Sequence, residues 1–151
     1  MIEINNLTSV SIDQEFLKKI AEGVLEKEHA QKKDISLAFV GPGRMKQINR
    51  RYRGKNRVTD VLAFPETRVE FDEFTVKDLY RDTQSLGEII ICLKEVKKNS
   101  RRYKSDFKTE LARVLIHGIL HLLGYDHERS EKDAAEMQEK ENQYLSQFLK
   151  D

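Results

Sequence analysis

The sequence predicts an α+β fold in a single domain, residues 1–151, with a small mixed β-sheet of about four strands packed with about five helices. The chain of 151 residues has the size of one ordinary domain. Segments with strand-like alternation occur between segments with helical spacing. No internal repeat, low-complexity tract or linker divides the sequence.

The N-terminal segment predicts a strand followed by a helix. Ile2 and Ile4 indicate a short first strand. Ser11 and Gln14 have the spacing of a capping box, which predicts that a helix begins there and runs to about His29. The apolar stripe of this helix consists of Phe16, Leu17, Ile20, Val24 and Leu25.

Residues 35–54 predict a second strand and a short basic helix. Apolar side chains alternate with polar or small ones over 35–39, which is typical of a half-buried strand. Gly-Pro-Gly at 41–43 is expected to close this strand. Apolar residues at helical spacing over 45–52 predict the basic helix, which ends at Gly54.

Two further strands flank a segment without a clear pattern. Residues 61–64 form a brief apolar run that Pro65 is expected to stop. Residues 66–85 show no clear period and predict a long loop or an excursion from the fold. Residues 87–93 contain consecutive aliphatic side chains, which indicates a strand buried on both faces.

The C-terminal part predicts three helices. Residues 93–104 form a basic helix. The next helix begins at Ser105 or Asp106 and stops at Gly124, and apolar residues cover most of its circumference, so we expect it to be the central buried helix. Ser130 with Asp133 predicts the start of a last helix, which continues to about residue 148.

Composition and the chain start exclude several classes of protein. The longest apolar stretch, residues 114–123, falls short of the roughly 20 residues of a spanning helix, and 35% of all residues are charged. We therefore expect no membrane association. The first residues, MIEINNLTS, lack the basic and apolar regions of a secretory signal. Because Cys92 is the one cysteine, no disulfide can form within the chain, and a cytoplasmic location is expected.

The net charge of +1 conceals an uneven distribution of charge. No acidic residue lies between Asp34 and Asp60, but this interval contains Arg44, Lys46, Arg50, Arg51, Arg53, Lys55 and Arg57. A second basic run contains Lys94, Lys97, Lys98, Arg101, Arg102 and Lys104. Either run can be the solvated face of a helix, but two in one small domain favour a surface that binds a polyanion.

Three of the four histidines fall within the eleven residues HGILHLLGYDH. On a helix, His117 and His121 differ by only about 40° in direction and 6 Å in height, so their rings project side by side. Gly124 lets the chain leave the helix and turn back, which can bring His127 to the same point. Three neutral imidazoles leave a fourth tetrahedral position open, as in a catalytic zinc site.

The alternative is that His117 and His121 are core histidines and that His127 is a solvated loop residue. Burying two imidazoles without partners would cost several kcal/mol, whereas coordination satisfies them. We therefore predict a zincin-like central helix that binds one Zn²⁺ per chain, or another divalent metal, through these three residues. A mid-helix glycine, Gly118, indicates close backbone packing beside the site.

HGILHLLGYDH, YRGKNRVTDVLAFP and LGEIIIC together resemble the YbeY family of bacterial endoribonucleases over essentially the whole chain. The resemblance implies that His117, His121 and His127 are metal ligands and that Arg53 acts in the catalytic cleft. The pattern of that family more often has a serine at the position of Ala63 and an aspartate at the position of Glu88. The resemblance further implies maturation of the 3′ end of 16S ribosomal RNA, ribosome quality control, and contacts with the small ribosomal subunit, a ribosomal protein and the GTPase Era.

These features predict a metal-dependent, single-strand-specific endoribonuclease whose catalytic residues are Arg53 and the metal ligand His117. The RNA-binding residues are predicted to be Arg50, Arg51, Arg53, Lys55 and Arg57. The spacing also matches the metzincin pattern HExxHxxGxxH, but Gly118 replaces the glutamate that acts as general acid and base, so a zinc-dependent peptidase is the alternative. A metal-stabilised RNA-binding assembly factor without catalysis is the third hypothesis.

Four other residues have open roles in this prediction. Asp60 and Asp126 either orient a ligand imidazole or serve in turns and caps. Tyr52 and Tyr125 either stack on bases or pack in the core. Cys92 is expected to be an inert buried thiol.

Overall fold

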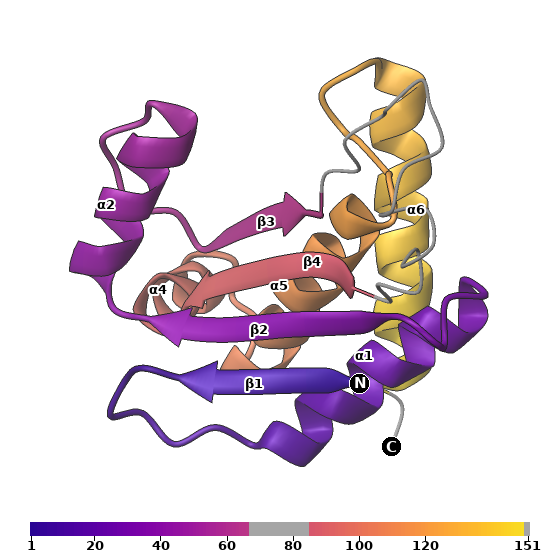
Figure 1. Cartoon of the computed structure of the whole chain (residues 1–151), viewed down its shortest axis with the longest axis horizontal. Helices are drawn as coiled ribbons and strands as arrows, with labels where there is room; N and C mark the ends of the chain where they lie inside the picture. The colour runs from indigo at the N-terminus through magenta and orange to yellow at the C-terminus, as the bar shows by residue number, and fades with distance from the viewer. Residues whose placement is uncertain (67–84, 150–151) are drawn as a thin grey trace, which may run out of the picture.

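The computed structural model describes residues 1–66 and 85–149. In this part of the chain, four strands form one mixed sheet in the order β1-β2-β4-β3, accompanied by five helices (Figure 1). β1, β2 and β4 are parallel, and β3 is antiparallel to β4. The predicted α+β class with a small mixed sheet is therefore confirmed.

The strands are β1 (Ile2–Asn6), β2 (Asp34–Val40), β3 (Val61–Pro65) and β4 (Ser85–Cys92). β4 lies between two neighbours, and its side chains enter two different hydrophobic clusters. Ile89 and Ile91 belong to the larger cluster, whereas Ile90 and Cys92 belong to the smaller one. The predicted burial of this strand on both faces is confirmed, and Cys92 is fully buried.

The helices are α1 (Gln14–Lys27), α2 (Pro42–Arg53), α4 (Leu93–Arg102), α5 (Phe107–Leu122) and α6 (Glu131–Phe148). Side chains of α1, α4, α5 and α6 share the larger cluster with one face of the sheet, and α2 packs on the opposite face. α5 contacts α1, α4, α6, β3 and β4, so it is the central helix that its apolar circumference predicts. No helix of the described part has the length and apolar character needed to cross a membrane.

The predicted start of the first helix is wrong for a local physical reason. α1 begins after Asp13, not at a capping box of Ser11, because the Asp13 carboxylate accepts the Phe16 backbone N–H at 3.1 Å. Gln14 is then the first helical residue, too early to serve as the distal half of a capping box. A carboxylate at this end also stabilises the helix dipole.

The two proline signals mark strand ends as predicted, because β2 ends at Val40 and β3 ends at Pro65. Pro42 and Gly43 belong to the first turn of α2, where the missing N–H of proline costs nothing. Pro65 is the last residue of β3, which is an edge strand of the sheet. The predicted long loop over 66–85 lies, except for its two end residues, outside the described residues.

Candidate metal centre

α5 carries His117 and His121 one turn apart, with ring centroids separated by 4.8 Å. Between them, Gly118 packs against β4. A Cβ atom at this position would lie 3.0 Å from the Cγ2 atom of Ile89, which is fully buried. The glycine therefore allows the close helix–sheet approach that the sequence indicates.

Gly124 reverses the chain after α5 and returns His127 to the helix end. Its φ is +102°, a conformation that glycine adopts without steric cost. Its N–H donates to the carbonyl of His121 at 3.0 Å, and the N–H of Tyr125 donates to that of Leu120 at 3.0 Å. The ring of His127 then lies 5.3 Å from that of His117 and 5.0 Å from that of His121, between centroids.

The chemistry of this donor set fits a metal ion. One nitrogen from each ring lies within 4.8 Å of those of the other two, and these are the three residues that the sequence singles out. Burial, followed by the neighbouring imidazoles of His117 and His127, lowers the pKa of His121 to about 4. This ring is therefore neutral near pH 7, which is the form that a metal ion requires.

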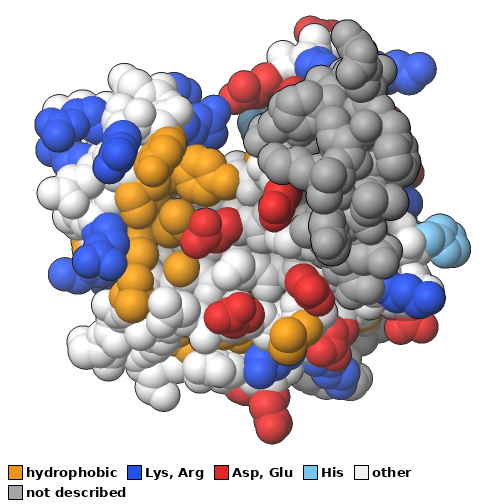
Figure 2. Space-filling model, viewed as in Figure 1, with side chains coloured by type: hydrophobic (Ala, Val, Ile, Leu, Met, Phe, Trp, Pro, Cys, Tyr) orange, Lys and Arg blue, Asp and Glu red, His pale blue; other side chains and the backbone are white. Residues whose placement is uncertain are grey.

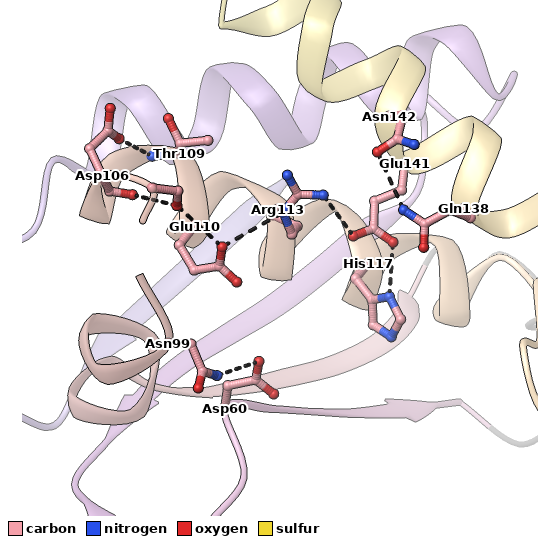
Figure 3. Close-up of polar contacts among 11 residues, drawn as sticks. Asp60, Asn99, Asp106, Thr109, Glu110, Arg113, His117, Gln138, Glu141 and Asn142 are labelled. Atoms are coloured by element: carbon pink, nitrogen blue, oxygen red, sulfur yellow. Dashed lines mark hydrogen bonds and ion pairs between the residues drawn. The ribbon is translucent and has the colours of Figure 1, made fainter. Parts of the chain in front are cut away.

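The second ring nitrogen of His117 has a carboxylate partner on α6 (Figure 3). Nδ1 lies 3.2 Å from Oε2 of Glu141, a residue only 7% exposed. The Arg113 guanidinium lies 3.8 Å from the other carboxylate oxygen, so Glu141 bridges the two side chains. Because a carboxylate can only accept a hydrogen bond, Nδ1 carries the proton and donates it. In a neutral ring, Nε2 then carries the lone pair that a metal ion can bind.

Sequence reasoning did not identify Glu141. It belongs to the acidic C-terminal segment and lies 24 residues from His117, so no local spacing connects the two. Only its place among apolar positions of α6, beside the buried Met137 and Tyr144, could have indicated that it faces inward.

A cavity of about 220 Å³ adjoins the three histidines. It lies between α2, β3 and α5, and the basic residues on its lining are Arg53, Lys55 and Arg57. Arg53 Nη2 lies 3.6 Å from a carboxylate oxygen of Glu128, and that oxygen is 3.9 Å from His127 Nε2. The structure therefore brings Arg53 to the histidine cluster.

The other two predicted RNA-binding residues have different positions. Arg50 and Arg51 are exposed on α2 but are not part of the cavity lining. Basic side chains gather around α2 on the face that Figure 2 displays. This surface extends beyond the cavity itself.

The remaining residues that the sequence singled out divide by environment. Asp60 lines the cavity and accepts a hydrogen bond from the Asn99 amide at 3.3 Å (Figure 3). Asp126 accepts the Glu128 backbone N–H at 2.8 Å, which is a turn role. Tyr125 donates to Glu28 at 2.7 Å and packs against the larger hydrophobic cluster.

The structure also places Cys92 and the two positions at which the sequence departs from the pattern that it resembles. Ala63 lines the cavity, whereas Glu88 is exposed on β4. Burial raises the pKa of the Cys92 thiol, which agrees with the predicted inert buried residue.

Comparisons with known proteins agree with this architecture. The profile of the family described as Endoribonuclease YbeY matches residues 3–149. A protein named Endoribonuclease YbeY from Persephonella marina is 43% identical over 84% of this chain and 78% of the relative. Another of that name from Sulfurovum sp. is 36% identical over 98% of this chain and 90% of the relative.

A solved structure shows the same likeness in three dimensions. The solution structure of a Thermotoga maritima protein superposes with a TM-score of 0.68 at 36% identity, covering 98% of this chain and 89% of the other. The matched span includes α2, β3 and α5 together with the three histidines. The chain belongs to the endoribonuclease YbeY family.

Proposed function

We propose that this protein is a metal-dependent endoribonuclease that cleaves single-stranded RNA. The observation that carries the proposal is the convergence of three imidazoles beside Arg53 in one cavity. Phosphodiester cleavage accumulates negative charge on phosphoryl oxygens, and a cation together with a guanidinium can neutralise that charge. The names of the relatives support RNA as the substrate.

His117, His121 and His127 would hold the metal, for which zinc is our first choice. When bound there, zinc supplies a Lewis acid and lowers the pKa of a bound water to about 7. Glu141 orients the ring of His117 through its Nδ1–H. The protein's own groups therefore present neutral nitrogen donors in a fixed arrangement.

Arg53 binds the scissile phosphate in this proposal. Its guanidinium has an exposed partner, Glu128, from which a phosphate can displace it at little cost. Lys55 and Arg57 contact the neighbouring phosphates inside the cavity. Arg50 and Arg51, together with the exposed basic residues of α4, attract the flanking RNA backbone.

We propose further that the RNA is ribosomal. The activity would mature the 3′ end of 16S ribosomal RNA and contribute to ribosome quality control in the cytoplasm. The partners would be the small ribosomal subunit, one of its proteins and the GTPase Era. Membership of the YbeY family is what supports this part of the proposal.

The site lacks the glutamate that the peptidase alternative requires. In the metzincin pattern, a glutamate follows the first histidine and serves as general acid and base. Here that position is Gly118, where a Cβ atom would already lie 3.0 Å from the buried Ile89. Proton transfer by a residue at this position is therefore unavailable to this chain.

Purified protein separates these hypotheses. With zinc, the wild type should shorten a structured RNA with single-stranded flanks, and His117→Ala should not. Elemental analysis should find about one zinc per wild-type chain. His29→Asn is the matched control, because His29 is exposed outside the cluster and asparagine tolerates its φ of +59°.

Other results would favour the alternatives. Hydrolysis of casein without cleavage of RNA would indicate a peptidase. Tight RNA binding with neither activity would indicate an assembly factor without catalysis.

A further inference from the structure

An exposed tyrosine stands at the edge of the cavity. Tyr52, in the last turn of α2, is 63% exposed, so it does not have the core role that the sequence left open. Its ring contacts that of Phe64 on β3 edge to face, with centroids 5.5 Å apart and an interplanar angle of 67°. The contact holds the Tyr52 ring in place while leaving most of it accessible to solvent.

The tyrosine belongs to a continuous apolar patch. Ile48 and Val58 are partly buried in the same small hydrophobic cluster as Phe64. Figure 2 shows hydrophobic side chains gathered over α2 and β3, with Lys and Arg on the α2 side and acidic side chains toward the middle of the sheet. We call Tyr52, Phe64, Ile48 and Val58 the aromatic patch.

This patch borders the candidate active site. Arg53 and Ala63, the chain neighbours of Tyr52 and Phe64, both line the cavity. β3 is an edge strand, so no further strand separates the patch from the cavity mouth in the described part of the chain. An RNA strand whose phosphate lies at Arg53 can therefore continue over this edge of the sheet onto the Tyr52 ring.

The charges on the α2 side of the patch favour a polyanion, whereas the exposed Glu88 lies opposite Phe64 in the β3–β4 pair. No acidic residue occurs between positions 34 and 60, and Arg50, Arg51 and Arg53 are all exposed. The Arg51 guanidinium lies 5.6 Å from the centroid of the Tyr52 ring. Proteins that bind single-stranded nucleic acid usually combine an aromatic ring with basic side chains along the path of the phosphate backbone.

We propose that Tyr52, supported by Phe64, stacks on a base of the RNA strand that enters the cavity. The stacked nucleotide flanks the one whose phosphate meets Arg53. A single exposed ring can stack on every base, so this subsite recognises unpaired bases without selecting a sequence. It thereby favours single-stranded over paired RNA, and this inference rests on the proposed function.

The test measures binding apart from cleavage. All proteins carry His117→Ala, so that the RNA stays intact, and the probe is a single-stranded oligoribonucleotide with 2-aminopurine at successive positions. At one position, its fluorescence should fall on binding because the base stacks on a ring. Tyr52→Ala should abolish that quenching and weaken binding by about 5- to 100-fold, while Tyr52→Phe should keep both.

Tyr103→Ala is the matched control. Tyr103 is also 63% exposed and follows the basic helix α4, but it is not part of the cavity lining. We expect it to change neither quenching nor affinity. In the cleavage-competent background, Tyr52→Ala should raise KM and leave kcat within about twofold, because its interaction is made equally in ground and transition states.

The outcomes separate this inference from the function on which it rests. If the RNA binds and Tyr52→Ala behaves like its parent, the stacking subsite is refuted and the nuclease proposal stands. An equal loss in Tyr103→Ala also refutes it, because any exposed ring would then suffice. If the parent protein binds no RNA at all, both proposals fail.

Discussion

The two nitrogens of the His117 ring face different surroundings. Nδ1 meets the buried carboxylate of Glu141, and Nε2 is left to join the other two histidines. Such a partner holds a ring in one tautomer and one orientation. Glu141 is therefore the residue through which α6 acts on the candidate metal centre.

Replacing Glu141 tests this link at the level of one hydrogen bond. We expect Glu141→Ala to weaken zinc binding by about 10- to 100-fold, because the His117 ring loses its orienting acceptor. Glu141→Gln keeps a carbonyl oxygen in place and should lose less. Competition titration with a chelating dye measures the affinities, and nitrogen-15 NMR of the metal-free protein reports the His117 tautomer. Equal affinities in all three proteins would contradict the assignment.

Arg53 should affect catalysis but not metal content. We expect Arg53→Ala to lower the rate of RNA cleavage by about 10²- to 10³-fold, because one source of charge stabilisation in the transition state is lost. Zinc content should stay near that of the wild type. Lys19→Ala is a suitable control, since Lys19 is an exposed cation on α1, outside both basic runs and the cavity lining. Unchanged turnover in Arg53→Ala removes this residue from the mechanism.

At the scale of elements, the contact between α5 and β4 sets the depth of the histidine helix. Gly118 touches Ile89 on the central strand, and Ile89 is fully buried. A side chain at position 118 would have to move one of two well-packed elements. The glycine thus serves packing, although it lowers the intrinsic helix propensity of α5 by about 1 kcal/mol.

A pair of alanine substitutions measures this contact. Gly118→Ala should lower the free energy of unfolding by about 1–3 kcal/mol, because overpacking against Ile89 outweighs the gain in helix propensity. Gly43→Ala, in α2, should instead raise it by up to about 1 kcal/mol, since no atom lies within 4 Å of the new Cβ position. Urea unfolding of both variants gives the signs. If Gly118→Ala stabilises the protein, Ile89 and β4 move to accommodate the added methyl group, and the predicted overpacking is contradicted.

At the scale of the whole molecule, Glu28 links three separate parts of the chain. It follows α1, accepts hydrogen bonds from Tyr125 and from the hydroxyl of Tyr144, and pairs with Lys140 of α6 at 3.3 Å. Burial alone raises its pKa, but the two hydroxyls and the ammonium outweigh that effect and lower it. Because Tyr125 lies two residues before His127, this network also supports the loop of the metal centre.

The lowered pKa of Glu28 predicts a specific dependence of stability on pH. Its contribution is complete above its ordinary pKa of 4.5 and is lost as the pH falls through the lower value of the folded state. Near neutral pH, we expect Glu28→Gln to reduce the free energy of unfolding by roughly 1.5–3 kcal/mol. The difference from the wild type should shrink on acidification below about pH 4.5.

Urea unfolding at a series of pH values checks this prediction. Glu26→Gln is the control, because Glu26 is an exposed residue of α1, the helix that Glu28 follows. A difference between wild type and Glu28→Gln that stays constant down to pH 3 would show that ionisation of Glu28 does not matter.

Local sequence signals predicted the helices and the strands well. Asp106 and Ser130 cap α5 and α6 through their side chains, and Gly54 ends α2 in the left-handed conformation. These signals depend on a few neighbouring residues, so they can be read along the chain. The start of α1 was predicted wrongly because Asp13, two residues after Ser11, caps the helix instead.

The sequence by itself determined the pairing of His117 with His121 and the turn at Gly124, because helical spacing and backbone freedom act over a few residues. Only the tertiary structure decided that Glu141 meets His117, that Arg53 reaches the histidines, and that Tyr52 stays exposed. Each of these facts depends on how α2, β3, α5 and α6 pack. That packing brings together residues far apart in sequence, and no local pattern records it.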